Sequence, residues 1–319
     1  IGKSHRTNDT SDMLMFNAEE AGIVVKFEKK DTPQKVNIKL FRQGPKDIRL
    51  NDTKISQKEL IGTLNTVIFC PEDLQLIKGT PSGRRRFLDM EISQTSATYY
   101  HQLMQYNRLL QQRNAVLKEY RGKNTIPLEE WDLQLADMAS FIVKKRLESL
   151  KKINLLIDLM NRKLTGGLEN LTIGYEQPYM DNGSLEYTKE GFYERIKAAL
   201  PQDRHRLSTS VGPHRDDLRF FSDAMDLKKF GSQGQQRTAV LSLKLSELEF
   251  IKSEVGEYPV LLLDDVLSEL DESRRTNLLQ FIHKRIQTFI TTTDIHDFKD
   301  LKSVQFISCE GGQVQYGQP

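Results

Sequence analysis

The most informative part of the chain is Pro259-Val260-Leu261-Leu262-Leu263-Asp264-Asp265, in which four apolar residues precede two adjacent carboxylates. The apolar run predicts a parallel strand that is buried on both faces. Ligands of open α/β sheets bind beyond the carboxyl ends of the strands, where these carboxylates lie. Asp264 is therefore a candidate ligand of Mg²⁺, which prefers oxygen, and Asp265 is a candidate for polarising water beside a phosphate. An acidic turn after a core strand is the alternative that this pattern alone leaves open.

Strands and helices alternate on both sides of this stretch. The pattern predicts helices over 237–253 and 272–284, strands over 260–263 and 288–292, and a closing hairpin through 304–308 and 313–316. Alternation of this kind is typical of an α/β sheet with parallel strands. The chain from about residue 206 onward is therefore predicted to form the back half of such a sheet.

The first eighty residues alternate between polar and apolar in the manner of strands. Residues 22–27 and 35–40 predict two strands joined by a turn over 29–33, and a second short turn follows at 43–46. Residues 66–70 predict a buried strand that ends at Pro71. These strands belong to the front part of the same α/β lobe.

The middle of the chain is predicted to be helical. Apolar residues recur every three or four positions over 128–164, which indicates one long helix with a single buried stripe. Pro127 suits the start of this helix and Gly166-Gly167 suits its end. A second helix is predicted over 98–120, so that two antiparallel helices form a small lobe. The basic groups 144–146 and 151–152 are interpreted as the solvated face of the long helix.

These patterns divide the chain into three parts. We predict a first part of an ATPase lobe over 1–83, a helical insertion lobe over 84–205, and a second part of the ATPase lobe over 206–319. The fold class is α/β, with a sheet like that of P-loop NTPases and an inserted, mostly helical lobe.

Composition narrows the class of protein only slightly. The chain has 319 residues, of which 38% are hydrophobic and 28% charged, as in globular proteins. No apolar run approaches the roughly 20 residues of a membrane-spanning helix, and no secretory signal is visible. The net charge is +2, so a DNA-binding face would have to be local. Cys70 and Cys309 are predicted to be buried free thiols of a cytoplasmic protein.

A second motif, Phe230-Gly231-Ser232-Gln233-Gly234-Gln235-Gln236-Arg237, opens the helix upstream of the carboxylates. Small residues at a helix start let backbone N–H groups approach an anion, and the helix dipole favours negative charge there. ABC-type ATPases use a motif of this kind, Leu-Ser-Gly-Gly-Gln, to bind the γ-phosphate of a nucleotide that the other subunit holds. The candidate nucleotide-binding residues are Ser232, Gln233, Gly234, Gln235 and Gln236. An ordinary helix cap is the alternative.

Directly after the carboxylates, Leu267-Ser268-Glu269-Leu270-Asp271 matches the loop through which ABC-type ATPases communicate across their dimer. Ser268 and Asp271 are the candidate residues of this D-loop. The signature motif, the strand with its carboxylates and this loop occur in the order and spacing that such an ATPase requires.

The chain resembles the RecF family of DNA-repair ATPases. The resemblance lies in the spelling of the signature, in Asp264-Asp265, and in four further segments at 3–7, 69–74, 79–89 and 210–218. It implies an ABC-type ATPase head related to Rad50 and SMC proteins, which binds ATP and Mg²⁺. It also implies ATP-dependent dimerisation on single-stranded or gapped DNA, and assistance to RecO and RecR in loading RecA. The insertion of about 120 residues fits a compact helical lobe and is too short for a long coiled coil.

Two positions depart from the pattern of related ATPases. Glu72 stands where relatives have a glutamine at the junction of the lobes, and it is a candidate for orienting the attacking water. Thr293 stands where transporter ATPases have a histidine. Both departures indicate slow hydrolysis, which suits a switch better than a pump. A transporter motor is further disfavoured by the spelling of the signature.

The phosphate-binding loop is expected to be absent from this chain. Gly2-Lys3-Ser4 looks like the end of such a loop, but the required glycine four residues earlier, the strand before it and the helix after it do not match. Two hypotheses therefore remain. In the first, the protein is an ATP-switched DNA-binding dimer with slow ATPase activity. In the second, this chain is an ATP-incompetent fragment that acts only as a DNA- or protein-binding module.

Two basic segments are ambiguous. Arg84, Arg85 and Arg86 either contact DNA phosphates or form a solvated helix start. His214-Arg215-Asp216 resembles a kinase catalytic loop, but Phe221 stands where that loop needs asparagine. No second histidine or cysteine supports a metal site there, so a turn with a hydrogen-bonded histidine is expected.

Overall fold

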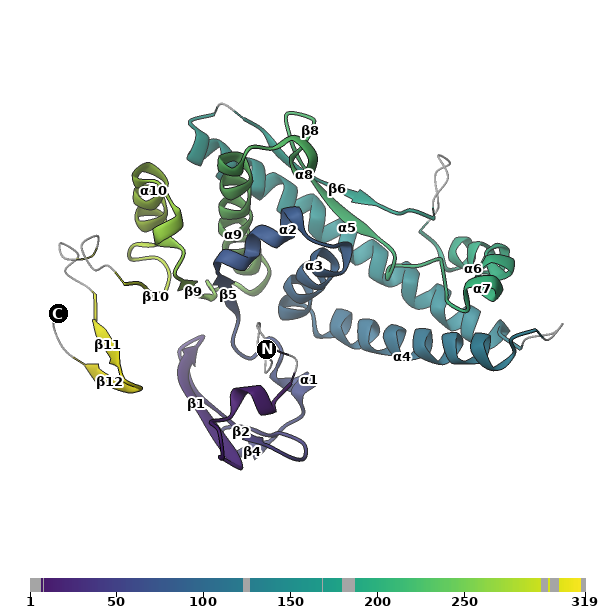
Figure 1. Ribbon diagram of the computed structural model, residues 1–319, viewed down its shortest axis with the longest axis horizontal. Helices are drawn as coiled ribbons and strands as arrows, with labels where there is room; N and C mark the ends of the chain where they lie inside the picture. The colour runs from purple at the N-terminus through teal and green to yellow at the C-terminus, as the bar shows by residue number, and fades with distance from the viewer. Residues whose placement is uncertain are drawn as a thin grey trace.

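The computed structural model describes residues 7, 9–122, 127–167, 169–179, 187–293, 298 and 304–316. The sequence resemblance at 3–7 and the loop-like Gly2-Lys3-Ser4 fall almost wholly outside the described residues. In the described part, a parallel sheet and a long helix form the centre, a two-helix arm extends from them, and an antiparallel sheet lies beside them (Figure 1).

The parallel sheet has the strand order β10-β9-β5, with β9 (Val260–Asp264) between β10 (Thr288–Thr291) and β5 (Thr66–Phe69). Both pairings are parallel, as predicted. The predicted burial on both faces of β9 is wrong. Leu261 and Leu263 are 1% exposed, whereas Val260 and Leu262 are partly exposed, because side chains alternate across a strand and the described residues cover the second face only in part.

One face of this sheet packs against α9 (Gln233–Val255), which lies at the centre of the molecule (Figure 1). Most residues of α9 are buried, as expected for a helix surrounded by other elements, and the buried residues include polar and charged side chains such as Lys244 and Glu247. It also packs on the arm through α5, and therefore connects the sheet to the arm.

The antiparallel sheet has the order β1-β2-β3-β4, with β1 (Glu20–Lys29), β2 (Thr32–Phe41), β3 (Asp47–Leu50) and β4 (Thr53–Lys54). The predicted hairpin is confirmed. Its turn residues Lys30 and Asp31 have φ of 49° and 59°, which is the two-residue turn that matches the twist of paired strands. A separate small core of Val36, Ile48 and Leu60 holds this sheet against α1 (Gln57–Leu60).

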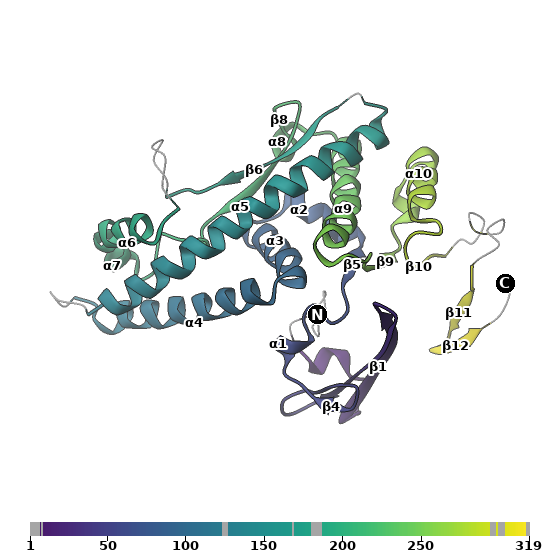
Figure 2. The same cartoon turned by 180° about the vertical axis from the view of Figure 1, so that it is seen from behind.

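The arm consists of α4 (Ala97–Glu119) and α5 (Glu129–Thr165), which lie side by side (Figures 1 and 2). The predicted long helix is confirmed, and it ends at Gly166, whose φ of 66° suits a glycine. Its predicted stripe is buried and includes Leu135, Ile142, Leu150, Ile153, Ile157 and Met160. The remaining arm elements are α6 (Lys189–Ala198) and α7 (Leu200–Arg206), near the far end.

The prediction that residues 144–146 form a solvated face is wrong for Arg146, which is 2% exposed. Arg146 lies four residues from both Ile142 and Leu150, and therefore on the buried stripe itself. Lys144, Lys151 and Lys152 are exposed, as predicted.

A third sheet runs along α5 in the order β6-β7-β8, with β6 (Leu171–Glu176), β7 (Asp217–Ser222) and β8 (Met225–Asp226) (Figure 2). This sheet joins strands from both sides of the predicted boundary at residues 205 and 206. Likewise, α3 (Pro81–Thr95) spans the predicted boundary at residues 83 and 84. The division into three parts stays a prediction.

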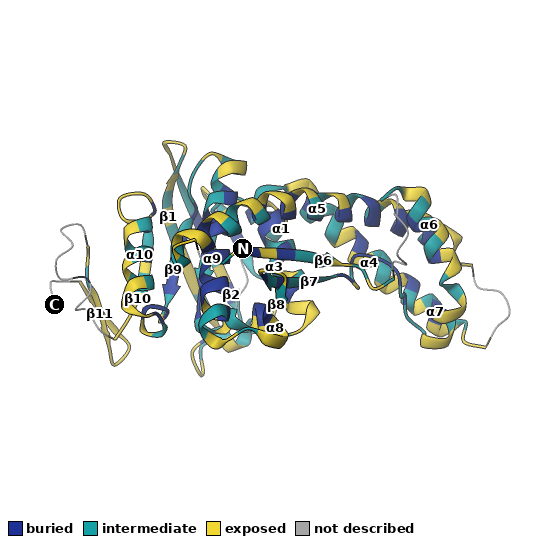
Figure 3. Cartoon of the chain, turned by 90° about the horizontal axis from the view of Figure 1, so that it is seen from above, coloured by how far each residue is buried: buried dark blue, intermediate teal, exposed yellow. Residues whose placement is uncertain are grey.

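The remaining elements are short or lie near the end of the chain. They are η1 (Ser11–Met13), η2 (Pro71–Leu74), α2 (Gln75–Lys78), α8 (Leu227–Phe230), η3 (Leu267–Glu269), α10 (Glu272–Ile282), β11 (Ile307–Glu310) and β12 (Gln313–Tyr316). The closing hairpin is confirmed, with its first strand at 307–310. All residues of β11 and β12 are exposed, as Figure 3 shows for β11. Cys70 is buried as predicted, but Cys309 on β11 is exposed, so that prediction is wrong for Cys309.

No helix in the described part of the chain combines the length and the apolar character needed to cross a membrane.

Candidate functional site

The carboxyl ends of the three parallel strands bring the predicted catalytic residues to one edge of the sheet. Asp264 ends β9, and its register partner on β10 is Thr291. The Thr291 hydroxyl donates to Asp264 Oδ1 at 2.8 Å and accepts from the Asp265 backbone N–H at 3.0 Å. One hydroxyl therefore orients both carboxylate residues. The sequence analysis did not single out Thr291, although a polar residue at the end of the neighbouring strand was visible.

Asp265 adopts a left-handed backbone with a φ of 54°, which aspartate tolerates better than most residues. Ser268 stabilises this turn, because its hydroxyl hydrogen-bonds the Asp265 carbonyl at 2.8 Å and lies 3.2 Å from Asp265 Oδ1. The Asp265 side chain is exposed. The turn thus presents a carboxylate to solvent directly beyond the strand, and Ser268 of the predicted D-loop shapes it.

Glu72 lies at the same edge, because β5 ends at Phe69 opposite Leu263 and Glu72 follows in η2. Its side chain is exposed. The turn that carries it is held by Asp73, whose Oδ2 accepts the Cys70 backbone N–H at 2.9 Å. The structure therefore brings Glu72 to the side of the sheet where Asp264 and Asp265 lie.

A buried lysine connects this turn to α9. Lys244 Nζ lies 3.3 Å from Asp73 Oδ1 and 3.3 Å from Glu247 Oε1. Glu91 of α3 shares the same buried region, and burial followed by the charge of Asp73 raises its pKa to about 7, against the opposing effect of Lys244. Burial, followed by the nearby Asp73, raises the pKa of the Cys70 thiol to about 12, so this thiol is not a nucleophile at neutral pH.

The donor atoms at the strand edge fit a magnesium ion. Asp264 and Asp265 offer carboxylate oxygens, and the edge is open to solvent. Mg²⁺ usually takes one or two carboxylates and completes its shell with water and substrate phosphates. No cluster of three or more histidine, cysteine, aspartate or glutamate side chains suited to a metal occurs among the residues that the structure describes. Asp264 remains the residue that we predict to hold the ion.

The signature motif forms the N-terminus of α9. Ser232 is its N-cap, and the Ser232 side chain accepts the Gln235 backbone N–H at 3.2 Å. The Gln235 side chain in turn accepts the Ser232 N–H at 3.0 Å, which completes a capping box. Ser232 and Gln233 are exposed, and a Cβ placed on Gly234 would meet no atom closer than 3.9 Å. The turn is thus ordered and open to a ligand from outside.

Two of the predicted nucleotide-binding residues point elsewhere. Gln236 is 5% exposed, and its Nε2 donates to the Leu227 carbonyl at 2.7 Å. Gln235 Nε2 donates to Glu169 Oε1 at 3.1 Å, which links the signature to the segment after α5. Gln236 therefore supports the motif from inside, and the outward-facing part of the signature is Ser232 to Gly234.

The signature helix also contacts the D-loop of the same chain, because Arg237 Nη1 donates to the Glu269 carbonyl at 3.3 Å. Asp271, the other D-loop candidate, is the N-cap of α10 and accepts the Arg274 N–H at 2.9 Å. This hydrogen bond is the main cause that lowers the pKa of Asp271. Asp271 is therefore a helix cap in this structure, and a role across a dimer stays a prediction.

Arg84 is a structural residue, and its predicted contact with DNA is wrong. Its guanidinium is 4% exposed and forms two parallel hydrogen bonds of 2.7 Å with the carboxylate of Asp217 on β7. A third hydrogen bond of 2.9 Å goes to the Gly79 carbonyl. DNA could reach this guanidinium only by breaking a bidentate ion pair in a buried setting.

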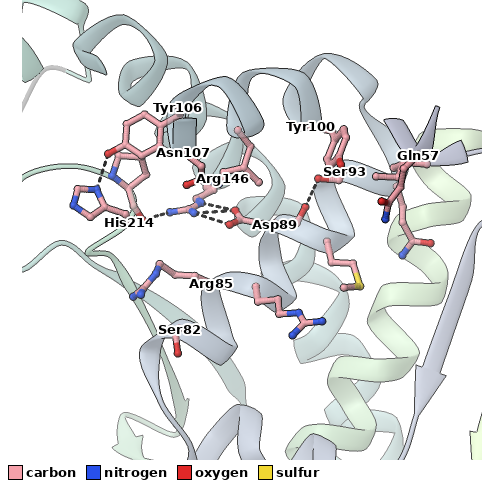
Figure 4. Close-up of a pocket in the computed structure, with 16 residues that line it drawn as sticks. Gln57, Ser82, Arg85, Asp89, Ser93, Tyr100, Tyr106, Asn107, Arg146 and His214 are labelled. Carbon is pink, nitrogen blue, oxygen red and sulfur yellow. Dashed lines mark hydrogen bonds and ion pairs between the residues drawn. The ribbon is translucent and has the colours of Figure 1, made fainter. Parts of the chain in front are cut away.

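Arg85 and Arg86, the next two residues of α3, are less buried than Arg84. Arg85 is half-buried and donates from Nη1 to the Asp216 carbonyl at 2.7 Å. Arg86 is exposed. Both line a cavity between α3 and α4 (Figure 4), so a contact with phosphate stays open for these two residues.

His214 is held in a turn, as expected. Its Nε2 lies 3.0 Å from the Thr209 carbonyl, and its Nδ1 lies 2.6 Å from the Tyr106 hydroxyl. Because a carbonyl only accepts, Nε2 carries the proton and Nδ1 accepts from the tyrosine. Burial lowers the pKa of His214 to about 4, against the opposing hydrogen bond to Thr209. The residue is therefore neutral near pH 7.

The sequence analysis missed two buried arginines, Arg146 and Arg113, that form ion pairs between different elements of the fold. Arg146 donates to Asp89 of α3 through two nitrogens (Figure 4) and to the Pro213 carbonyl at 2.7 Å. It also lies 3.4 Å from Asp216. Tyr175 also donates to Asp216. Arg113 is fully buried and pairs at 2.6 Å with both Asp132 and Asp203. The available signal was their position on otherwise apolar helix faces.

No protein-family model matches the chain. It is 46% identical over 304 residues to the DNA replication and repair protein RecF of Alkaliphilus oremlandii (strain OhILAs), covering 94% of this chain and 83% of that protein. It is 45% identical over 315 residues to RecF of Clostridium botulinum (strain Eklund 17B / Type B), covering 98% and 86%.

Solved structures agree with this similarity. A structure of the recombination mediator RecF with ATP, from the RecFOR pathway, matches with a TM-score of 0.91 and 34% identity, covering 99% of this chain and 85% of that one. An Smc head bound to the winged-helix domain of ScpA matches with a TM-score of 0.53 and 14% identity, over 98% of this chain and 79% of that one. The second match concerns the fold alone. The predicted fold, an ABC-type ATPase head with a helical lobe, is confirmed.

Proposed function

This chain belongs to the RecF family of DNA replication and repair proteins, and we propose that it works as an ATP-controlled DNA-binding protein of recombinational repair. In this proposal, two copies hold two nucleotides between them. The signature turn of one copy contacts the phosphates that the other copy binds. ATP favours this closed dimer because its γ-phosphate adds contacts that ADP lacks.

The observation that carries the proposal is the exposure of an ordered signature turn. Ser232 and Gln233 face solvent at the N-terminus of a 23-residue helix, while the capping box keeps their backbone in place. A helix start in this state attracts anions through its N–H groups and its dipole. A phosphate brought by a second copy can therefore reach it without any rearrangement of the turn.

The strand edge supports the other half of the proposal. Bound Mg²⁺ would neutralise phosphate charge beside Asp264. Asp265 and Glu72 lie at the same edge and are our candidates for orienting the attacking water. Thr291 holds both aspartates in register, which makes it a positioning residue for this chemistry. Slow hydrolysis is expected, so that the nucleotide acts as a timer of the closed state.

The biological setting is proposed from the family. Related structures are described as the recombination mediator RecF of the RecFOR pathway. We propose that this protein likewise binds single-stranded or gapped DNA, works with RecO- and RecR-type mediators, and assists the loading of RecA in the cytoplasm.

Sedimentation of the native protein that contains this chain tests the ATP-dependent dimer. We expect dimers with ATP–Mg²⁺ and monomers with ADP. The variant Gln233→Glu places a negative charge where the phosphate would bind. It should raise the dissociation constant of the dimer by about tenfold or more, yet leave the thermal midpoint unchanged or slightly higher, because an acidic residue suits the first helical turn.

Gln105→Glu is the matched control, since Gln105 is an exposed glutamine on α4. It should dimerise like the unchanged protein. Dimerisation of Gln233→Glu at the same concentration as the control would contradict the proposal. Calorimetry with ATP–Mg²⁺ on this chain, beside the native protein, tests the second hypothesis, because ATP binding by the native protein but not by this chain would favour an ATP-incompetent binding module.

A further inference from the structure

A cavity of about 530 Å³ lies between α3 and α4 (Figure 4). This volume is within the range of about 300–1,000 Å³ that is typical of small-molecule sites. Arg146, Pro213 and His214 line one end, and Gln57 and Ile61 line another. The signature, the strand edge and the D-loop contribute no residue to it.

The cavity carries an excess of positive charge. Arg146 is neutralised there by Asp89 and Asp216. Arg85 has one hydrogen bond, from Nη1 to a backbone carbonyl, and Arg86 has none within the described ranges of the chain. Burial, followed by the nearby charge of Arg146, lowers the pKa of Arg85. An anion bound beside Arg85 would therefore stabilise its charged guanidinium.

The carboxylates around these two arginines already have cations of their own. Asp217 is held by Arg84, and Asp89 is held by Arg146. Consequently, no carboxylate that the structure describes beside the cavity forms an ion pair with Arg85 or Arg86. Guanidinium groups bind phosphate with planar, bidentate hydrogen bonds, which makes phosphate the anion that best fits such a pair.

The opposite wall offers an aromatic ring and an amide. Tyr100 and Asn107 lie seven residues apart on α4 and therefore on the same face of the helix. Tyr100 is partly exposed, and Asn107 is exposed. Met90 and Leu103 add apolar wall between the two ends. Proteins that bind single strands combine an aromatic ring, on which an unpaired base stacks, with basic side chains that hold the phosphate, and this cavity is lined by both.

We propose that this cavity binds one unpaired nucleotide of a DNA strand, with its phosphate at Arg85 and Arg86 and its base against Tyr100. The inference rests on the proposed DNA-binding function and adds to it the nucleotide unit that is recognised. A base in a duplex is stacked and paired, so only a strand with an unpaired base can fill the cavity. The cavity therefore gives the protein a physical means to prefer single-stranded segments over continuous duplex.

The test uses the native protein with ATP–Mg²⁺ and fluorescence anisotropy on a labelled single strand and on a blunt duplex of equal length. Tyr100→Leu should weaken binding to the single strand by roughly tenfold and leave binding to the duplex unchanged. Arg86→Gln should weaken binding to the single strand and lower its logarithmic salt slope by about 0.7. Both side chains are at least partly exposed, and equal thermal midpoints would show that the variants fold.

Arg108→Gln is the control for charge, because Arg108 is an exposed arginine on α4 that does not line the cavity. It should show no difference between single strand and duplex. Equal losses on single strand and duplex in Tyr100→Leu, or no loss on either, would overturn the proposal.

Titration with deoxyadenosine monophosphate and with inorganic phosphate distinguishes the source of the phosphate. If the variants lose affinity for the free nucleotide but keep that for the strand, the cavity serves a free nucleotide and the proposal is wrong. If the unchanged protein binds DNA but neither variant changes the affinity for single strand, duplex or free nucleotide, the cavity proposal fails and the proposed function stands. If the unchanged protein with ATP binds no DNA, the proposed function fails as well.

Discussion

Replacement of Arg146 by methionine should destabilise the protein strongly. The Arg146 side chain is 2% exposed and joins α5 to Asp89 of α3 and to Asp216 before β7. Methionine has a similar length but cannot donate, so it leaves two carboxylates without their cation. Asp216 is fully buried, and one of its oxygens already has no partner among the described residues.

The expected loss is about 3–5 kcal/mol, which is the usual cost of removing one partner from a buried ion pair. The lower half of this range is the better estimate, because Asp89 is 17% exposed and can recover some hydration. Urea denaturation followed by circular dichroism measures the effect. With a slope of about 3 kcal/mol per molar urea, the midpoint should fall by about 1 M or more.

Lys144→Met is the matched control, since Lys144 is exposed on the same helix two residues earlier. Its stability should stay within about 0.5 kcal/mol of the unchanged protein. Adding Asp216→Asn to Arg146→Met should recover part of the loss, because the amide carries no uncompensated charge. A loss below about 1 kcal/mol in Arg146→Met, or an equal loss in the control, would refute the reasoning.

Three further predictions concern other parts of the molecule. The pKa of His214 is about 4 in the folded state and about 6.5 when unfolded. The stability from the neutral ring is therefore complete above pH 6.5 and is lost as the pH falls toward 4, by roughly 1–3 kcal/mol; His214→Gln should flatten this slope in urea titrations at several pH values. Gly212→Ala should cost about 1–3 kcal/mol in thermal unfolding, because the new Cβ would lie 2.3 Å from the Tyr106 hydroxyl at a φ of +132°; Gly22→Ala, which meets nothing within 4 Å, should be close to neutral. Under the proposed function, Thr291→Val should slow ATP hydrolysis by about tenfold with little change in stability, and Thr291→Ser should restore it; unchanged hydrolysis in Thr291→Val would remove this residue from the site.

Local patterns predicted most of the elements correctly. The long helix α5 has a proline before its first turn, a stripe of regular period and two glycines at its end, so its bounds follow from short-range rules. The hairpin of β1 and β2 is similarly local. The prediction that β9 is buried on both faces was wrong, because an apolar sequence shows that the side chains are apolar but not what covers them. Which neighbours cover each face depends on elements far away in the chain.

Adjacent arginines on α3 show the same limit at the candidate site. Arg84, Arg85 and Arg86 are equivalent as letters, but each residue turns by about 100° around the helix axis. One consequently pairs with Asp217, the next contacts the Asp216 carbonyl, and the third has an exposed side chain that lines the cavity. Partners 133 and 131 positions away along the chain thus determine the roles of Arg84 and Arg85.

The amino-acid order alone was enough for the family resemblance, the strand with its carboxylates, and the signature turn, because each depends on residues close together in the chain. The partners of Arg84 and Arg146, the bridge from Thr291 to both aspartates, and the cavity beside Tyr100 came only from the folded arrangement. The physical reason is that hydrogen bonds and ion pairs act over a few ångströms in space. Packing of distant segments, rather than their sequence spacing, sets which groups come that close.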